Sequence, residues 1–147
     1  MNKINEKNIR KYALKLLKQD YNCGEVVVRT VANNLKIKLP IVAKKISSAM
    51  NGGGRAGAQC GILEAGLLIL SLLCGRADSK QPRDPLQILA YKLTKKFENE
   101  YGNLLCRNIR PEGFKPDQIN NICEERIIYG IIFLLNFFEE ISNLEKV

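Results

Sequence analysis

Residues 60–75, CGILEAGLLILSLLCG, constrain the fold more than any other segment because they are apolar on almost every side when placed on a helix. Such a helix is stable only when it is buried all round. Gly75 follows the last apolar residue, as is typical where a helix ends. The sequence therefore predicts a central buried helix with the other elements packed around it.

The remaining segments repeat their apolar residues at helical spacing, and strand-like alternation is almost absent. Asn22 and Glu25 have the spacing of a capping box, which predicts a helix that starts at Cys23. We therefore predict an all-α single domain over residues 1–147, a bundle of about five to six helices. The predicted helices are 5–19, the one that begins after Asn22, 39–50, 60–75, 86–101 and the one capped by Asp117 that runs to about Leu144.

Two segments between these helices differ from the rest in composition. Residues 76–85, RADSKQPRDP, are polar and contain proline, so we predict a flexible loop there. The stretch NGGGRAG before Cys60 places its glycines directly ahead of a thiol at a helix start. This stretch is either a plain helix connection or a ligand-binding loop, but it lacks the G-K-[ST] ending of a nucleotide P-loop.

Composition excludes several classes of chemistry. The chain has 147 residues, 46% of them hydrophobic, which suits a globular domain. It has no histidine, which excludes a Ser-His-Asp triad, a Cys-His protease pair and zinc sites with His ligands. We find no signal peptide, and the apolar runs are shorter than the roughly 20 residues that span a bilayer. We therefore expect a cytoplasmic protein that does not interact with a membrane.

The five cysteines do not form a C-x-x-C pair, so a thioredoxin motif is absent. Cys74 lies about 21 Å along the predicted helix from Cys60, and we expect it to be a buried apolar residue. The other four lie in separate segments, two of them near predicted helix N-termini that favour thiolates. These four thiols predict a Cys₄ metal site, formed by Cys23, Cys60, Cys106 and Cys123.

The stretch GGGRAGAQCGILEAG, with the single cysteines in DYNCGEVV, NLLCRNI and INNICEER, resembles the C_GCAxxG_C_C family of redox-active proteins. The resemblance covers nearly the whole chain and matches the four cysteines named above, while Cys74 has no counterpart. Ile62 replaces the family alanine and Ala65 the family glycine, with Gly66 one position later. These changes affect close helix packing more than ligation.

The same pattern is similar to the non-haem part of split-Soret cytochromes, and this implies an iron–sulfur cluster, of the 2Fe–2S type, as the cofactor. Arg55 and Arg107 would offset its negative charge. Glycines let backbone N–H groups approach such a cluster closely, because no Cβ stands in the way. The glycines predicted to bind the cofactor are Gly52, Gly53, Gly54, Gly57 and Gly61.

Other functions remain open from the sequence alone. Thiolates also bind zinc, and a metal-free thiol–disulfide protein would use the same residues. A DNA-binding module is a weaker alternative, with PIVAKKISSAM as the recognition helix offering Lys44, Lys45, Ser47 and Ser48. The net charge of +8 suits it, but the basic residues are spread along helix faces. We find no catalytic residues beyond the cysteines, and expect a redox partner protein and no nucleic acid; a homodimer is compatible with the sequence.

Overall fold

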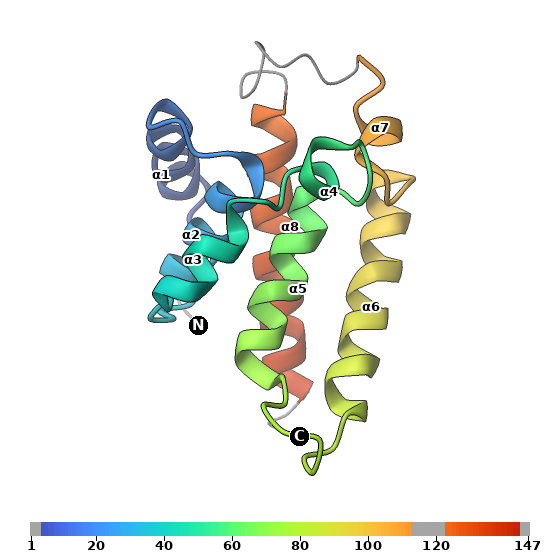
Figure 1. Ribbon diagram of the computed structural model, residues 1–147. Helices are drawn as coiled ribbons and strands as arrows, with labels where there is room; N and C mark the ends of the chain where they lie inside the picture. Colours follow the sequence, from blue (N-terminus) through green and yellow to red (C-terminus); the bar gives the residue numbers. More distant parts are fainter. Residues whose placement is uncertain (1–3, 113–122, 145–147) are drawn as a thin grey trace.

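The computed structural model describes residues 4–112 and 123–144. It confirms the all-α prediction, since the described residues contain helices and one isolated bridge but no strand. Figure 1 shows the arrangement. The helices are α1 (Glu6–Lys18), α2 (Cys23–Asn34), α3 (Ile41–Ser47), α4 (Gly52–Arg55), α5 (Gly61–Cys74), α6 (Asp84–Tyr101), α7 (Cys106–Ile109) and α8 (Glu124–Leu144).

Helix α5 is the central helix that its sequence predicts, but it is not buried all round: Leu72 and Leu73 in its last turn are exposed, and Cys74 is half-buried. It packs against α2, α6 and α8, and residues such as Leu63, Ile69 and Leu70 are fully buried. A Cβ on Gly66 would lie 2.6 Å from a methyl group of Leu134 on α8, so glycine is needed where these helices meet. Gly66 thus allows this close helix packing one position after Ala65, the residue that replaces the glycine of the family pattern.

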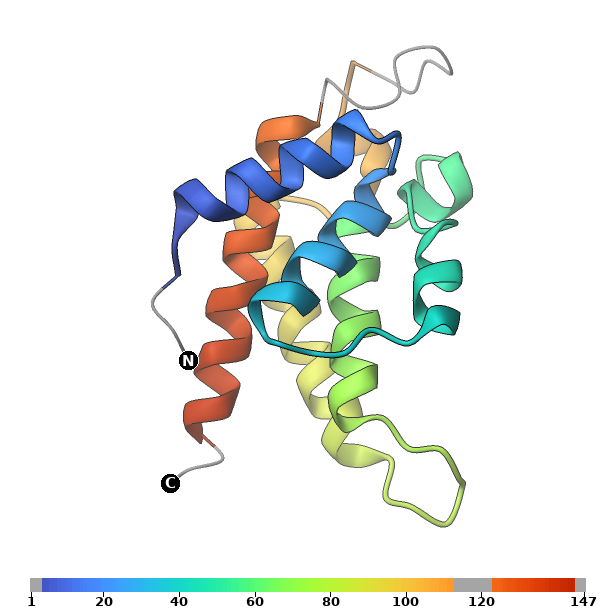
Figure 2. The ribbon, with the colours of Figure 1, turned by 90° about the vertical axis from the view of Figure 1, so that its left-hand side faces the viewer.

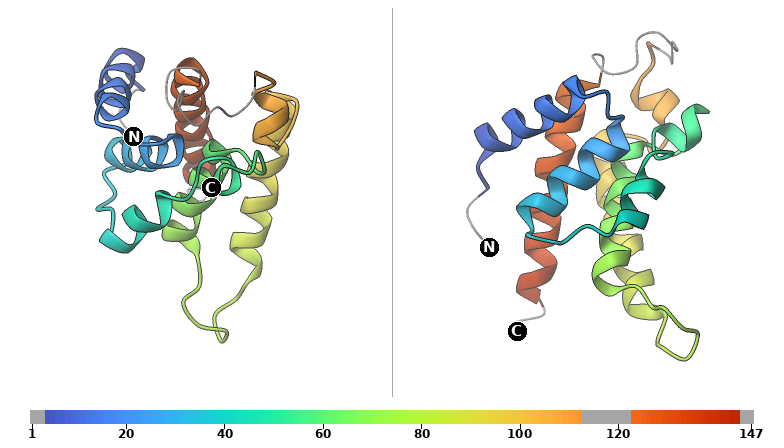
Figure 3. Two further views of the ribbon diagram at one scale, coloured as in Figure 1. Left: turned by 45° about the horizontal axis from the view of Figure 1, so that its top comes forward. Right: turned by 60° about the vertical axis from the view of Figure 1, so that its left-hand side comes forward.

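Helices α1 and α6 lie on opposite sides of the bundle (Figure 3). Helix α1 crosses α2 and α8, as Figure 2 shows, and its buried residues include Ile9, Ala13 and Leu16. Among the described helices, α8 alone is long and apolar enough to cross a membrane by length and composition. Half of its apolar window is buried inside the fold, and core helices of soluble proteins pass the same test.

The predicted start of α2 is confirmed at atomic detail. The side chain of Asn22 accepts a hydrogen bond from the Glu25 N–H at 3.0 Å, and the Glu25 carboxylate accepts one from the Asn22 N–H at 3.1 Å. This reciprocal capping box fixes where α2 begins. It therefore also fixes Cys23 as the first residue of that helix.

Several boundaries differ from the predicted ones. The helix predicted through Met50 ends at Ser47, because turns occupy the residues before the glycine loop. Ser47, offered above to a DNA groove, is buried, and its hydroxyl donates to the Lys44 carbonyl at 2.7 Å. Asp117, the predicted cap of the last helix, lies outside the described residues.

Candidate functional site

Each of the four predicted ligand cysteines lies at the beginning of a helix. Cys23 is the first residue of α2, and Cys106 is the first residue of α7. Cys60 is the N-cap of α5. Cys123 directly precedes α8, and its carbonyl accepts a hydrogen bond from the Ile127 N–H at 2.8 Å. Free N–H groups gather at helix starts, and those next to Cys23 and Cys60 lower the cost of negative charge on the sulfur without outweighing burial.

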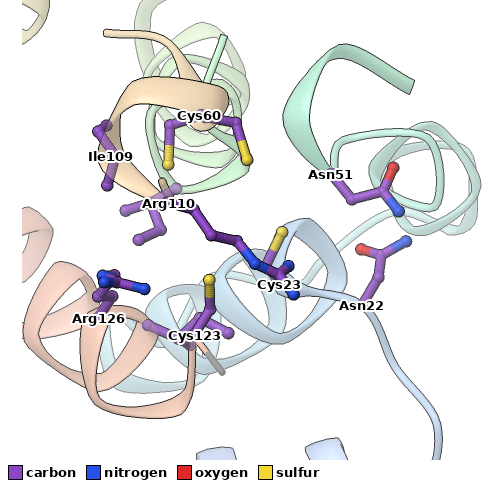
Figure 4. Close-up of a pocket in the computed structure, with 12 residues that line it drawn as sticks. Asn22, Cys23, Asn51, Cys60, Ile109, Arg110, Cys123 and Arg126 are labelled. Atoms are coloured by element: carbon purple, nitrogen blue, oxygen red, sulfur yellow. The ribbon is translucent and has the colours of Figure 1, made fainter. Parts of the chain in front are cut away.

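The structure brings these four cysteines together around one cavity of about 40 Å³. The sulfur atoms of Cys23, Cys60 and Cys123 face the same space in Figure 4, with Arg110 reaching into it. Ile62 and Ile127 supply apolar wall. Residues that are far apart in the sequence therefore form one thiol-lined site.

Cys74 does not belong to this site. It lies at the other end of α5 and lines a separate cavity with apolar neighbours such as Leu35 and Phe138. Its Sγ donates to the Leu70 carbonyl at 3.1 Å. The thiol is therefore accommodated within its own helix.

Backbone hydrogen bonds fasten Cys60 to Cys106. The Cys60 N–H donates to the Leu104 carbonyl at 2.9 Å, and the Cys106 N–H donates to the Ala58 carbonyl at 2.6 Å. These bonds flank the antiparallel bridge between Gln59 and Leu105. The two thiols are thus held in place by main chain, independently of their side-chain contacts.

Two glycines hold Cys23 against the start of α5. The Met50 carbonyl lies between Gly24 and Gly61, where neither position has room for a Cβ. A Cβ on Gly61 would lie 2.7 Å from the Cys23 sulfur, which itself is 3.7 Å from the Met50 oxygen. Gly24 and Met50 were missed by the sequence analysis. The Cys-Gly step that occurs at both helix starts is the pattern that indicates them.

The glycine loop forms a left-handed turn. Gly52, Gly53, Gly54 and Arg55 have φ values of 74°, 59°, 64° and 69° in succession. Burial raises the pKa of the Glu64 carboxyl on α5, and the nearby Gly53 N–H opposes that rise. The Ala58 N–H donates to the Gly52 carbonyl at 3.0 Å, which closes the loop.

Of the five glycines predicted to bind a cofactor, Gly61 lies in the cavity wall. The remaining members, Gly52, Gly53, Gly54 and Gly57, are not part of that wall. The Gly57 carbonyl instead accepts from the Arg107 N–H at 3.1 Å, which ties the loop to α7. Contact of these four with a cofactor stays a prediction.

Two arginines that the sequence analysis did not select line the cavity. Arg110 is only 4% exposed, and its N–H donates to the Cys106 carbonyl at 2.8 Å, one turn away. Arg126 follows Cys123 by three residues and forms an ion pair with Glu112 at 2.6 Å. Arg110 and Arg126 line the cavity, whereas Arg55 and Arg107 do not.

Burial keeps the thiols of Cys23, Cys60 and Cys106 protonated in the absence of a cation. It raises the pKa of Cys60 to about 12, although N–H groups at the start of α5 oppose the rise. The pKa of Cys23 is also raised by burial, and further by the nearby Cys60. Burial raises the pKa of Cys106 as well, while the charge of Arg110 lowers it. A group bound here must replace protons.

Four thiols around a small cavity have the donor chemistry of a soft metal ion or an iron–sulfur cluster. Within residues 4–112 and 123–144, however, no three His, Cys, Asp or Glu side chains are grouped so that they hold a metal ion. In a tetrahedral zinc site with bonds of about 2.3 Å, the sulfurs lie about 3.8 Å apart. To bind a single ion, the four sulfur atoms would therefore have to move closer together. The cavity of about 40 Å³ has room for roughly three water molecules, and so for a group larger than a single metal ion.

The family described as "Putative redox-active protein (C_GCAxxG_C_C)" matches residues 21–131. The matched range includes all four cysteines of the cavity and the glycine loop. No curated protein and no solved structure matches the chain.

Proposed function

Because the chain belongs to the C_GCAxxG_C_C family of redox-active proteins, we propose that it is a small electron-transfer protein that binds a 2Fe–2S cluster through Cys23, Cys60, Cys106 and Cys123. The observation that carries the proposal is the convergence of these thiols from four separate helix starts on one cavity. When bound, such a cluster supplies reversible one-electron chemistry.

The residues around the thiols suit a group with negative charge. Helix starts direct N–H groups at Cys23 and Cys60, and arginines stand beside the other two cysteines. Ile62, Ile109 and Ile127 limit the access of water to the cavity. A low local dielectric strengthens each of these interactions, which is one way in which a protein sets a reduction potential.

Metal analysis of the protein purified without oxygen tests the proposal. We expect iron and acid-labile sulfide in equal amounts, with visible absorption that reductant bleaches. Stoichiometric zinc in a colourless preparation would replace this function with a structural zinc site. Protein without metal, whose free-thiol count falls on mild oxidation, would instead indicate a thiol–disulfide function.

Metal binding to the apoprotein should strengthen steeply with pH. Burial raises the pKa of Cys23, Cys60 and Cys106, so these thiols are protonated near neutral pH and release their protons on binding. Each released proton adds about tenfold in apparent affinity per pH unit. Titrations with Co²⁺ between about pH 6 and 8, followed by thiolate–cobalt absorption, measure this slope. A constant affinity over that range would show that the thiolates exist before the metal binds.

Replacing Arg126 should weaken metal binding without unfolding the protein. Arg126 is half-buried at the cavity, where its positive charge offsets that of bound thiolates. We expect Arg126→Gln to lower Co²⁺ affinity about tenfold or more, as expected for a charge lost a few ångströms away. Arg107→Gln is the matched control, because Arg107 is exposed and does not line the cavity. Equal effects of the two substitutions would contradict the assigned role.

A further inference from the structure

One exposed face of α1 carries a row of lysines. Lys11, Lys15 and Lys18 are exposed and lie on the same side of the helix at spacings of four and three residues. They line an open groove of about 800 Å³ with Tyr12 and, from α2, Asn33. We call this groove the lysine face.

The charge of the lysine face is not neutralised within the part of the chain that the structure describes. The ion pairs found there include none of its three lysines, and its wall contains no carboxylate. Glu6 and Asp20 lie near the two ends of α1. Arg10, on another side of the helix, forms a bidentate ion pair with Glu125, with N–O distances of 2.6 and 2.8 Å. The lysine face therefore presents positive charge to solvent.

The lysine face lies beside the more accessible edge of the thiol site. Helix α1 packs on α2 and α8, the helices that begin at Cys23 and directly after Cys123 (Figure 2). These two cysteines are partly exposed, whereas Cys60 and Cys106 are buried at 7% and 8%. Lys18 ends α1 five residues before Cys23, so this end of the lysine face lies toward the site, whereas Asn33 lies at the other end of α2.

We propose that an acidic protein surface docks on the lysine face, which places it next to the Cys23–Cys123 edge; this inference names the partner of the proposed redox site and rests on that function. Electron-transfer partners form small interfaces, and opposite charges speed their encounter. The chemistry favours carboxylates over phosphates. Lysine is a point charge, while planar recognition of phosphate favours arginine, and the wall contains none. The nearby Arg29 stacks on Tyr21 at 4.3 Å.

The test compares two triple variants of the full chain, purified without oxygen. One is Lys11→Gln, Lys15→Gln, Lys18→Gln, and the control is Lys38→Gln, Lys44→Gln, Lys45→Gln, which removes equal charge from other exposed lysines. Glutamine keeps the helix propensity of lysine, so both should fold. The probes are a poly-L-glutamate peptide of about 20 residues and a duplex DNA of about 20 base pairs, and backbone amide shifts measured by NMR map each footprint.

We expect poly-L-glutamate to shift the amides of α1 in a salt-dependent way, with about a tenfold loss of affinity in the α1 variant and less than about threefold in the control. Equal losses in both variants, or tighter binding of the duplex through the same lysines, would overturn the proposal. The assay is independent of the cofactor. If metal analysis finds no iron while the lysine face still binds the peptide, the cluster assignment fails and the docking surface stands. If the iron content is normal but the peptide leaves no footprint on α1, the docking surface fails and the cluster assignment stands.

Discussion

A Cys60→Ser variant is expected to purify without iron or zinc, whereas Cys74→Ser retains the full amount. Cys60 lines the thiol cavity and is held there by the main-chain bonds to the segment before Cys106. Serine removes a soft thiolate from a set of four, and the metal should be lost with it. Metal content and visible absorption of both variants, purified without oxygen, measure the contrast.

Cys74 is a demanding control because it lies on the same helix as the site. Its sulfur lines a different cavity and bonds to the Leu70 carbonyl, a bond that a serine hydroxyl can also form. We therefore expect Cys74→Ser to lower the free energy of unfolding by only about 1 kcal/mol. Equal metal loss in both variants, or full retention in Cys60→Ser, would contradict the assignment of the four ligands.

Local sequence was sufficient to predict that Cys23 and Cys60 lie at helix starts. The capping box at Asn22 and Glu25 depends on residues three apart, so it predicts the position of Cys23 without tertiary information. The apolar run after Cys60 likewise predicts a buried helix that starts there. The fold class follows from the same helical periodicity.

The contacts between helix starts were not predictable in this way. Arg110 and Arg126 reach the cavity only because α7 and α8 meet there, and nothing in their own neighbourhoods distinguishes them from Arg55 or Arg107. The glycine loop was expected to direct its N–H groups to a cofactor. Whether they reach one stays a prediction, because it depends on how the loop folds against α5, where Glu64 lies near Gly53.

The position of the Met50 carbonyl between Gly24 and Gly61 could not be predicted from local sequence either. It underlies a second prediction with a large expected effect. Gly61→Ala should disrupt both the fold and the site, because the new Cβ would lie 2.7 Å from the Cys23 sulfur and against the Met50 oxygen. Cys23 begins α2 and Met50 lies in the turn between α3 and α4, so one of these neighbours must move. We expect a loss of about 3 kcal/mol in the free energy of unfolding, measured by urea denaturation, and a reduced metal content.

Gly54→Ala separates this crowding from the ordinary cost of replacing a glycine. Gly54 has φ 64°, and an added Cβ would have nothing within 4 Å, so alanine there would bear conformational strain of about 1 kcal/mol but no clash. Gly61 has no positive φ, and alanine is otherwise favoured within a helix. The larger loss in Gly61→Ala must then come from contact with Cys23 and Met50. Similar stability of the two variants, with normal metal content in both, would mean that the start of α5 moves without consequence for the thiol site.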